Sequence, residues 1–257
     1  MLSIQPVPAF NDNYIWLIST AESNQAYVVD PGDPAVVEKA LQAQELTLAG
    51  ILITHHHFDH VGGLAELKAK YNATVYGPDN PAIEGLDHIV KAGDEVDVFG
   101  ATFSVLEVPG HTLDHIAYFS SGDNPLIFCG DTLFAGGCGR VFEGTHEMMY
   151  DSLTTLAELP ADTRIYCAHE YTLANLDFAR AVEPNNTPLS QRIGDAQATR
   201  NAGNPTVPST LSLELATNPF VRCTTPELQA SLRAQNKLTS EHPAAVFATV
   251  REWKDNF

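Results

Sequence analysis

The chain has 257 residues, of which 44% are hydrophobic and 18% are charged, a composition typical of a soluble globular protein that can bury a substantial core. Its 14 basic and 32 acidic side chains give a formal net charge of −18, which argues against nucleic acid and anionic membranes as partners because both attract basic surfaces. No apolar run is long enough to span a bilayer, and residues 1–8 lack the basic start and long apolar stretch of a signal peptide.

The first two thirds of the chain alternates short apolar runs with segments of helical spacing. Strands are predicted, from β-branched and alternating apolar residues between turn signals, at 13–19, 26–29, 51–53, 74–76, 95–99, 102–108, 116–120, 126–129 and 164–168. Helices are predicted at 36–41, 64–70 and 148–159, whereas residues 78–94 are rich in Pro, Gly and Asp and read mostly as loop. This pattern indicates a layered α/β domain.

A dense cluster of histidines follows the predicted strand at 51–53: His55, His56, His57, Asp59 and His60. If the backbone stays extended, alternation places His55 and His57 on one face and His56 on the other, so His56 is not expected to be a ligand. Gly62-Gly63 allows the chain to turn directly afterwards. Imidazole nitrogens and a carboxylate suit zinc or another borderline metal, and the spacing predicts a metal site.

Other residues that can bind a metal stand at the ends of other predicted strands. His111 follows the strand that ends at 108, Asp131 follows 126–129, and His169 follows 164–168. Loops at strand ends in layered α/β proteins can converge on one point, so these side chains are expected to join the histidine cluster.

Beyond about residue 172 the strand pattern stops. Helices are predicted there at 175–182, 189–201, 209–217, 226–235 and 244–255, separated by Pro, Asn and Gly. The chain is therefore expected to have two domains, a metal-binding catalytic domain at 1–172 and a small helical domain at 173–257.

These motifs resemble those of the metallo-β-lactamase superfamily and, within it, the glyoxalase II (hydroxyacylglutathione hydrolase) family. The resemblance covers nearly the whole chain and rests on Val29-Asp30-Pro31-Gly32, Thr54 through Gly63, Pro109-Gly110-His111-Thr112, Gly130-Asp131-Thr132-Leu133-Phe134, Gly137-Cys138-Gly139-Arg140, His169-Glu170-Tyr171-Thr172 and the pair Arg251 and Lys254. The histidine motif specifies only the superfamily, and the later motifs narrow it to the family. The resemblance implies a four-layer αββα sandwich with a small C-terminal helical domain.

The resemblance also implies a binuclear site. One metal would be held by His55, His57 and His111, the other by Asp59, His60 and His169, and Asp131 would bridge them. Two divalent ions per chain are expected, with zinc first and iron or manganese as alternatives. Seven protein ligands leave two zinc ions with open positions for a water and a substrate oxygen.

The activity implied is hydrolysis of a glutathione thioester, S-D-lactoylglutathione, to D-lactate and glutathione in methylglyoxal detoxification. The residues assigned to catalysis are His55, His57, Asp59 and Asp131. Asp30 and His115 resemble positions that orient ligands, although either could be an ordinary buried hydrogen-bonding residue.

Glutathione carries two carboxylates, so its site needs cations or donors. The resemblance assigns its binding to Arg140, Tyr171, Arg251 and Lys254, with Asn175 as a further candidate. Arg251 and Lys254 are three residues apart and share one helix face, although a solvated helix end would also favour basic residues. Arg140 stands where many relatives have Lys and Phe142 where they often have Tyr, which places one substrate contact in doubt.

Other functions of the same fold leave different signatures. A β-lactamase would need an export signal, and a nuclease should have a basic surface. A mononuclear-iron persulfide dioxygenase would bind one iron and consume oxygen, leaving Asp59 and His60 without a metal. A metal-binding module without turnover would share the ligands but show no activity.

The four cysteines, Cys129, Cys138, Cys167 and Cys223, have no short paired spacing and predict neither a disulfide framework nor a zinc knuckle. A reducing, cytoplasmic setting is therefore expected, with a monomeric chain whose only partner is the small-molecule substrate. Cys138 lies near the implied site but lacks a paired base, so it is not expected to act as a nucleophile.

Overall fold

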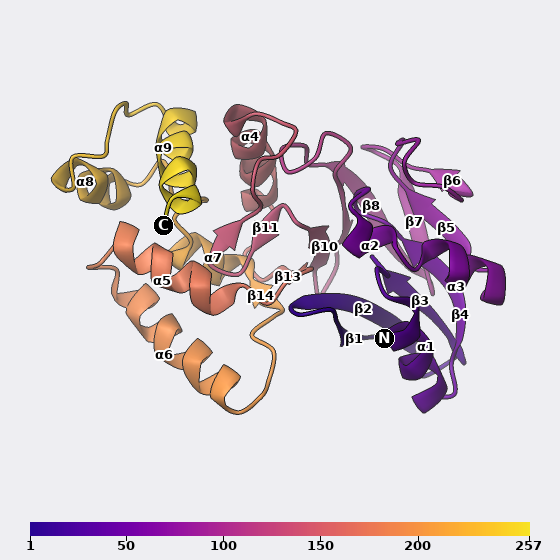
Figure 1. Cartoon of the computed structure of the whole chain (residues 1–257). Coiled ribbons are helices and arrows are strands. Elements are labelled where there is room, and N and C mark those ends of the chain that lie inside the picture. The colour runs from indigo at the N-terminus through magenta and orange to yellow at the C-terminus, as the bar shows by residue number, and fades with distance from the viewer. The chain divides into compact units, whose positions relative to one another are not determined.

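The computed structural model describes all residues 1–257, which divide into two units. Unit 1 comprises Met1–Glu107 and Asp114–Gly130, and unit 2 comprises Val108–Leu113 and Asp131–Phe257. Figure 1 shows the strands β1 to β10 of unit 1 in indigo to magenta and the helices of unit 2 in rose to yellow. None of the helices is long and apolar enough to cross a membrane.

The first sheet of unit 1 contains six strands in the order β1-β2-β3-β4-β5-β6. They are β1 (Leu2–Ala9), β2 (Asn13–Thr20), β3 (Gln25–Val29), β4 (Thr47–Leu52), β5 (Thr74–Gly77) and β6 (His88–Ile89). The first three pair antiparallel, and β3 to β6 pair parallel because helical crossovers connect β3 to β4 and β4 to β5. The helices are α1 (Pro34–Ala43), α2 (Phe58–Val61) and α3 (Leu64–Tyr71).

Both faces of the first sheet are covered. Residues 13–19 of β2 are buried without alternation, which is the pattern of a strand packed on two sides. One set of its side chains, Ile15 and Leu17, packs with Val37 and Leu41 of α1 and Leu67 of α3. Asp33 caps α1 by accepting a hydrogen bond from Ala35 N, and Pro34 stands in its first turn, which explains why the helix begins there.

A second sheet of unit 1 is a meander in which consecutive strands pair antiparallel. Its strands are β7 (Glu95–Val98), β8 (Ala101–Glu107), β9 (Ile116–Ser120) and β10 (Leu126–Gly130). Tyr118, fully buried in β9, donates its hydroxyl hydrogen bond to the carbonyl oxygen of Ile53 at 2.9 Å and so ties this sheet to the chain that leaves β4. The two sheets thus meet next to the histidine cluster.

Unit 2 holds two small strand pairs and the remaining helices. The strands are β11 (Leu133–Phe134), β12 (Gly137–Cys138), β13 (Arg164–Cys167) and β14 (Ser209–Thr210), with β11 paired to β12 and β13 to β14. The helices are α4 (His146–Ala157), α5 (Thr172–Val182), α6 (Thr187–Asn201), α7 (Leu211–Thr217), α8 (Pro226–Ala234) and α9 (Pro243–Asp255). Leu176 and Ala179 of α5 pack on Leu189 and Ala196 of α6, and these helices lie side by side in Figure 1.

The predicted α/β class with a C-terminal helical region is confirmed, and most predicted elements are present within a few residues. Strand β1 was missed because Pro6 and Pro8 argue against a strand, yet an edge strand tolerates proline where the missing N–H faces away from its neighbour. The short elements α2, β6, β11, β12 and β14 were also missed. The domain boundary between residues 172 and 173 stays a prediction, and α5 begins at Thr172.

Candidate metal centre and substrate pocket

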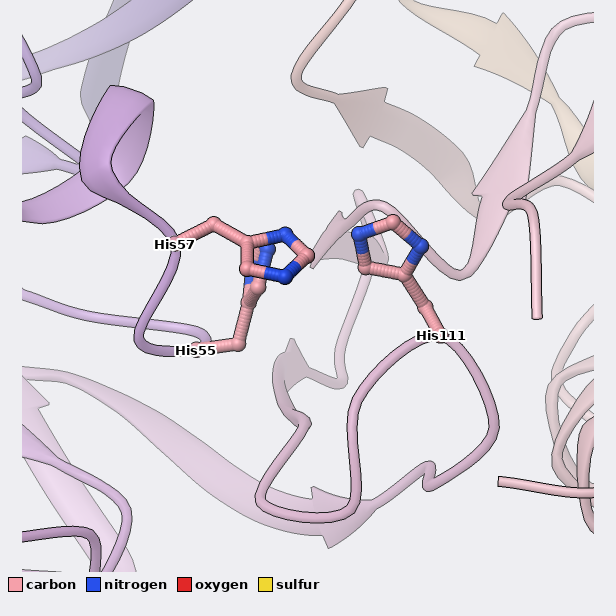
Figure 2. A group of neighbouring side chains, drawn as sticks. All are labelled: His55, His57 and His111. Atoms are coloured by element: carbon pink, nitrogen blue, oxygen red, sulfur yellow. The ribbon is translucent and has the colours of Figure 1, made fainter. Parts of the chain in front are cut away.

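The histidine motif of unit 1 leaves β4 in an extended conformation and then enters α2. His57 has extended backbone angles at the start of α2, so Asp59 and His60 lie in the first turn of a helix rather than on an irregular turn. Figure 2 shows the rings of His55 and His57 next to each other, with centroids 4.8 Å apart. The loop between β3 and α1 comes close to α2 at Gly32. A Cβ at this position would lie 1.9 Å from the carbonyl oxygen of Asp59, so the close approach requires glycine.

The carboxylate of Asp30 contacts two residues of this motif, Thr54 and His60. It accepts hydrogen bonds from the backbone N–H and the hydroxyl of Thr54, both at 2.8 Å. The Thr54 hydroxyl oxygen in turn lies 3.0 Å from Nδ1 of His55, and Oδ2 of Asp30 lies 3.1 Å from Nδ1 of His60. Because the Thr54 hydroxyl donates its hydrogen to Asp30, its oxygen accepts from Nδ1 of His55, which favours the His55 tautomer with its lone pair on Nε2, the atom that a metal would use.

Asp59 is held by a residue that sequence reasoning missed. Asn13, at the start of β2, donates a hydrogen bond from Nδ2 to Oδ2 of Asp59 at 2.9 Å. The same oxygen lies 3.4 Å from Nε2 of His60. Nothing in the sequence singles out Asn13, because asparagine next to Asp12 in a turn is a common local pattern.

Two further histidines of unit 1, His56 and His115, lie beside the predicted ligands. His56 turns to Asp114, with Nδ1 and Oδ1 2.9 Å apart, and Asn80 donates a hydrogen bond to the other oxygen of that carboxylate. His115 stacks on His55 with ring centroids 4.5 Å apart, and its Nδ1 lies 3.1 Å from the carbonyl oxygen of Ile116. His115 therefore fixes the plane of the His55 ring through packing.

Unit 2 supplies the three other predicted ligands, each from a loop. His111 stands in the segment that leaves β8 (Figure 2), Asp131 follows Gly130 at the end of β10, and His169 follows β13. All three are buried. Asp131 lies between the two histidines, with Oδ2 3.4 Å from Nε2 of His111 and Oδ1 3.3 Å from Nε2 of His169.

The distances from the Asp131 oxygens to the two histidine nitrogens fit a cation bound between each pair of atoms better than a direct hydrogen bond. Nδ1 of His111 lies 2.7 Å from the carbonyl oxygen of Arg140 and must donate to it, so a neutral ring turns its Nε2 lone pair toward Asp131. A lone pair facing a carboxylate is repulsive unless a cation lies between them. Two ligand atoms that are each about 2.1 Å from one tetrahedral ion are about 3.4 Å apart, which is the separation seen here. The donor set of unit 2 therefore fits a divalent metal.

The five residues predicted to bind the substrate line one hollow in unit 2. Its volume is about 250 Å³, and it is lined by Phe134, Cys138, Arg140, Tyr171, Ala174, Asn175, Arg251 and Lys254. The ring of Tyr171 stacks on His169 at 4.7 Å between centroids, and the edge of Phe134 meets Tyr171 at 5.3 Å. The pocket thus adjoins one of the predicted ligands.

The cations of this pocket differ in how firmly they are held. Arg251 is buried, donates to the carbonyl oxygen of Cys138 at 3.1 Å and pairs with Asp255 at 2.9 Å. Lys254 is more exposed, donates to the carbonyl oxygen of Ala174 at 3.2 Å and lies over the ring of Phe178. Partial burial, with the positive charge of Arg251 beside it, lowers the pKa of Lys254 below its usual value. Both side chains lie on α9, as their spacing predicts.

Three further residues line the pocket: Asn175, Arg140 and Cys138. Asn175 donates to the carbonyl oxygen of Ala135 at 3.3 Å, which gives it a part in shaping the pocket wall. Arg140 is exposed and lies over the ring of Phe142, which has no hydroxyl to donate. Burial raises the pKa of the Cys138 thiol to about 11, which agrees with the expectation that it is not a nucleophile.

The chain is similar in sequence and in fold to known proteins. Residues 10–169 match the metallo-beta-lactamase superfamily profile, and residues 170–257 match the profile of the hydroxyacylglutathione hydrolase C-terminus. A protein from Pseudomonas aeruginosa named hydroxyacylglutathione hydrolase is 50% identical, with both chains covered completely. The solved structure of ETHE1 from Myxococcus xanthus is 28% identical with a TM-score of 0.66, covering 99% of this chain and 98% of its own.

A second solved structure, TTHA1623 in a di-iron-bound form, is 26% identical with a TM-score of 0.60 and covers 84% of this chain and 99% of its own. The matched profiles and the named relatives make the chain a metal-dependent hydrolase of the metallo-β-lactamase superfamily, and its His/Asp clusters are groups that could hold metal ions. Within that superfamily, the chain belongs to the hydroxyacylglutathione hydrolase family.

Proposed function

We propose that the protein hydrolyses the thioester of S-(2-hydroxyacyl)glutathione, with S-D-lactoylglutathione as its substrate, in the detoxification of methylglyoxal. Water adds its oxygen to the acyl carbon, the carbon–sulfur bond breaks, and the products are a 2-hydroxy acid and glutathione, whose thiolate takes up a proton. The observation that carries this proposal is the pocket of unit 2, whose lining contains Arg140, Arg251 and Lys254 in a chain of net charge −18. A ligand with carboxylates needs such a local concentration of cations.

We further propose that the ligands of the two units hold two divalent ions. His55, His57 and His111 would bind one, Asp59, His60 and His169 the other, and Asp131 both; each triad is among the groups of this chain that could hold a metal ion.

Zinc is the metal we propose, since imidazole and carboxylate ligands in a four-coordinate geometry suit it. When bound, two such ions lower the pKa of a water and polarise a carbonyl oxygen. The chain's own residues do the rest of the work. Asn13 and Asp30 hold Asp59 and His60 in place, and the carbonyl oxygen of Arg140 fixes the tautomer of His111.

The pocket residues would orient the glutathione part of the substrate. Arg251, anchored by Asp255 and the Cys138 carbonyl, offers a preorganised guanidinium for a carboxylate, whereas Lys254 offers a more mobile point charge. The leaving thiolate is stable enough to depart without a strong general acid, so no such residue is required. The helical domain at 173–257 would in this way contribute Asn175, Arg251 and Lys254 to substrate binding, and the domain at 1–172 would contribute Arg140, Tyr171 and the catalytic residues.

A reducing cytoplasmic location and a monomeric state complete the proposal. All four cysteines are free thiols and are buried, which suits a compartment where disulfides do not persist. The molecular mass of the purified protein in solution tests the monomeric state.

One experiment tests both the activity and the metal content. Protein purified without added metal is analysed for its elements and assayed with S-D-lactoylglutathione in parallel. We expect two metal ions per chain, loss of thioester, and loss of both after dialysis against a chelator. A single iron per chain, with oxygen uptake and an intact thioester, would instead identify a dioxygenase.

Replacement of Lys254 by alanine is expected to raise KM about ten-fold and to leave kcat within about three-fold, because a charge-assisted contact to the substrate is lost in the ground state and the transition state alike. Because a lysine attracts carboxylates only while protonated, and its pKa is lowered here, wild-type KM should also rise on the alkaline side earlier than for an ordinary lysine. Steady-state kinetics across pH measure both effects.

Lys237→Ala is the matched control for this substitution. Lys237 belongs to unit 2 and lies 4.2 Å from the centroid of the Trp253 ring, so its loss also removes a lysine packed on an aromatic ring, but it does not line the pocket. Its KM should equal that of the wild type. If Lys254→Ala lowers kcat and leaves KM unchanged, the assignment of Lys254 to substrate binding is wrong.

A further inference from the structure

The β11–β12 hairpin forms one wall of the substrate pocket and begins two residues after Asp131. Phe134 at its start meets the rings of His169 and Tyr171, and Cys138 at its end accepts the hydrogen bond from Arg251. Each strand has only two residues, and the turn between them places Gly136 at φ +71°. A hairpin of this length does not hold its own position, so contacts from outside must fix it.

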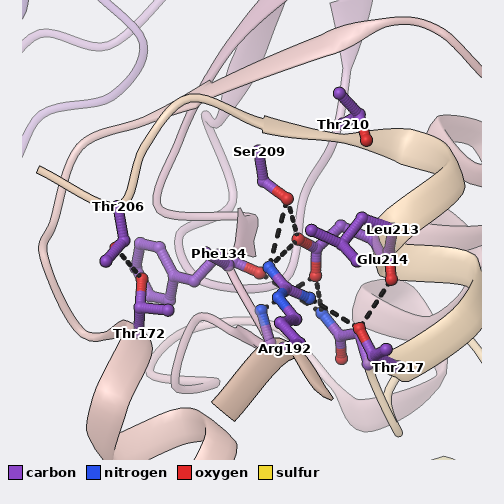
Figure 3. A network of polar contacts seen from close by, with 12 residues as sticks. Phe134, Thr172, Arg192, Thr206, Ser209, Thr210, Leu213, Glu214 and Thr217 are labelled. Atoms are coloured by element: carbon purple, nitrogen blue, oxygen red, sulfur yellow. Dashed lines mark hydrogen bonds and ion pairs between the residues drawn. The ribbon is translucent and has the colours of Figure 1, made fainter. Parts of the chain in front are cut away.

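A buried polar network underlies this hairpin (Figure 3). Glu214 on α7 is fully buried, and its Oε2 accepts a hydrogen bond from the backbone N–H of Gly136 at 2.8 Å. Its other oxygen, Oε1, lies 2.5 Å from Nη2 of Arg192, a buried side chain of α6, and accepts a hydrogen bond from Ser209. A second guanidinium nitrogen of Arg192 donates to the hydroxyl of Thr217 at 2.7 Å.

Asn218 completes the network on the hairpin side. It is fully buried, and its Nδ2 lies 2.9 Å from the carbonyl oxygen of Gly137, 3.2 Å from that of Phe134 and 3.0 Å from Oε2 of Glu214. Its Oδ1 accepts a hydrogen bond from Phe220 N, which fixes the orientation of the amide. Asn218 and Glu214 therefore contact three successive parts of the hairpin backbone: Phe134, Gly136 and Gly137.

The network is poorly explained as a device for stability alone. Moving Glu214 and Arg192 out of water is costly, and their attraction offsets that cost without a large surplus, so an apolar pair of similar volume would serve the core as well. What a satisfied polar network provides is one defined arrangement of the backbone groups it contacts. Here those groups belong to the pocket wall.

We propose that Glu214 and Asn218 are positioning residues of the hydrolytic reaction, which hold the β11–β12 hairpin so that Phe134 and the Cys138 carbonyl keep Tyr171, His169 and Arg251 in the geometry that binds the substrate. This inference rests on the proposed function. It adds a site behind the pocket wall, at the end of α7, that acts on substrate binding through the hairpin backbone.

The test compares Asn218→Ala with Thr217→Val in the full-length, metal-loaded protein. Thr217 is the neighbouring residue, is equally buried and belongs to the same network, but its hydroxyl contacts Arg192 and the Leu213 carbonyl rather than the hairpin. Asn218→Ala should raise KM for S-D-lactoylglutathione about ten-fold with kcat within about three-fold, whereas Thr217→Val should keep both near wild type. Thermal unfolding of both variants records any loss of stability.

A second readout follows the hairpin itself. Cys138 is a buried free thiol on β12, and Cys223 is a buried free thiol of the same unit outside the hairpin. Alkylation of each by iodoacetamide under native conditions, followed by mass spectrometry, should be about ten-fold faster at Cys138 in Asn218→Ala than in wild type and unchanged at Cys223, because local opening exposes only the hairpin.

The outcomes separate the two hypotheses. If Asn218→Ala matches Thr217→Val in both KM and Cys138 alkylation while the wild type hydrolyses the thioester, the network is merely structural and this inference is wrong. If the wild type does not hydrolyse the thioester, the proposed function fails first. Should Asn218→Ala not fold, Asn218→Leu provides the same test, since leucine fills a similar volume, loses the two donors and adds no charge beside Glu214.

Discussion

Asp131→Asn is expected to lower kcat for thioester hydrolysis by more than about a hundred-fold and to reduce the metal content of the purified protein. Losing a residue that only hydrogen-bonds to a metal ligand costs about 10- to 100-fold in metal affinity or activity. The effect of changing Asp131 should be larger, because Asp131 is itself a predicted ligand and lies next to two others, His111 and His169. The amide has the shape of the carboxylate but no charge, and it turns an NH2 group toward either His111 or His169. Elemental analysis and steady-state kinetics measure the two effects.

Asp114→Asn serves as the control for that substitution. Asp114 contacts His56, the histidine of the motif that alternation does not predict to be a ligand, and accepts a hydrogen bond from Asn80. The chemical change is identical, yet turnover should stay within a few-fold of wild type because His56 is not a predicted ligand. Full metal content with wild-type turnover in Asp131→Asn would contradict its assignment as the bridging ligand.

Glu214→Ala is expected to lower the free energy of unfolding by about 3–5 kcal/mol, because it leaves the Arg192 charge buried without its counterion. In a chain of this size the midpoint of thermal unfolding should fall by roughly 10 °C. The effect arises from the burial of both partners, whose side chains are 0% and 5% exposed. Differential scanning calorimetry of the variant and the wild type measures it.

Two further variants show whether burial is the cause. Glu241→Ala removes the partner of Arg233, but that pair is exposed, so unfolding should change by no more than about 0.5 kcal/mol. Replacing both Arg192 and Glu214 with apolar residues of similar volume should recover much of the stability lost in Glu214→Ala, since no charge is then left alone. A double variant as unstable as the single one would show that hydrogen bonds, rather than the uncompensated charge, dominate.

Unit 2 contains cationic side chains with two different roles. Arg251 and Lys254 give a strongly acidic protein a local cationic pocket, and their charge must remain available to a ligand. The charge of Arg192 is buried and is neutralised by an ion pair with Glu214. The family resemblance singled out Arg251, but nothing in the sequence indicated that the charge of Arg192 is buried and paired with Glu214.

The sequence by itself predicted the α/β class, the positions of most strands and helices, and the residues suited to bind metal. It could do so because those features are local: Ile51 to Ile53 reads as a buried strand from its own residues, and the spacing of His55 and His57 places both on one face whatever the rest of the chain does. The same alternation predicts that His56 is not a ligand, and in the structure its ring contacts Asp114.

The family motifs already pointed to Asp30, but only the tertiary structure identified Asn13 and Asn218 as supports of the ligands and the pocket. Asn13 reaches Asp59 across 46 residues, and Asn218 reaches Gly137 across 81. None of these partners has a local signal, because a hydrogen bond between distant segments depends on how strands and helices pack and not on the neighbours of either residue. The chemistry of the chain is thus readable from its motifs, but the geometry that would make it effective comes from long-range packing.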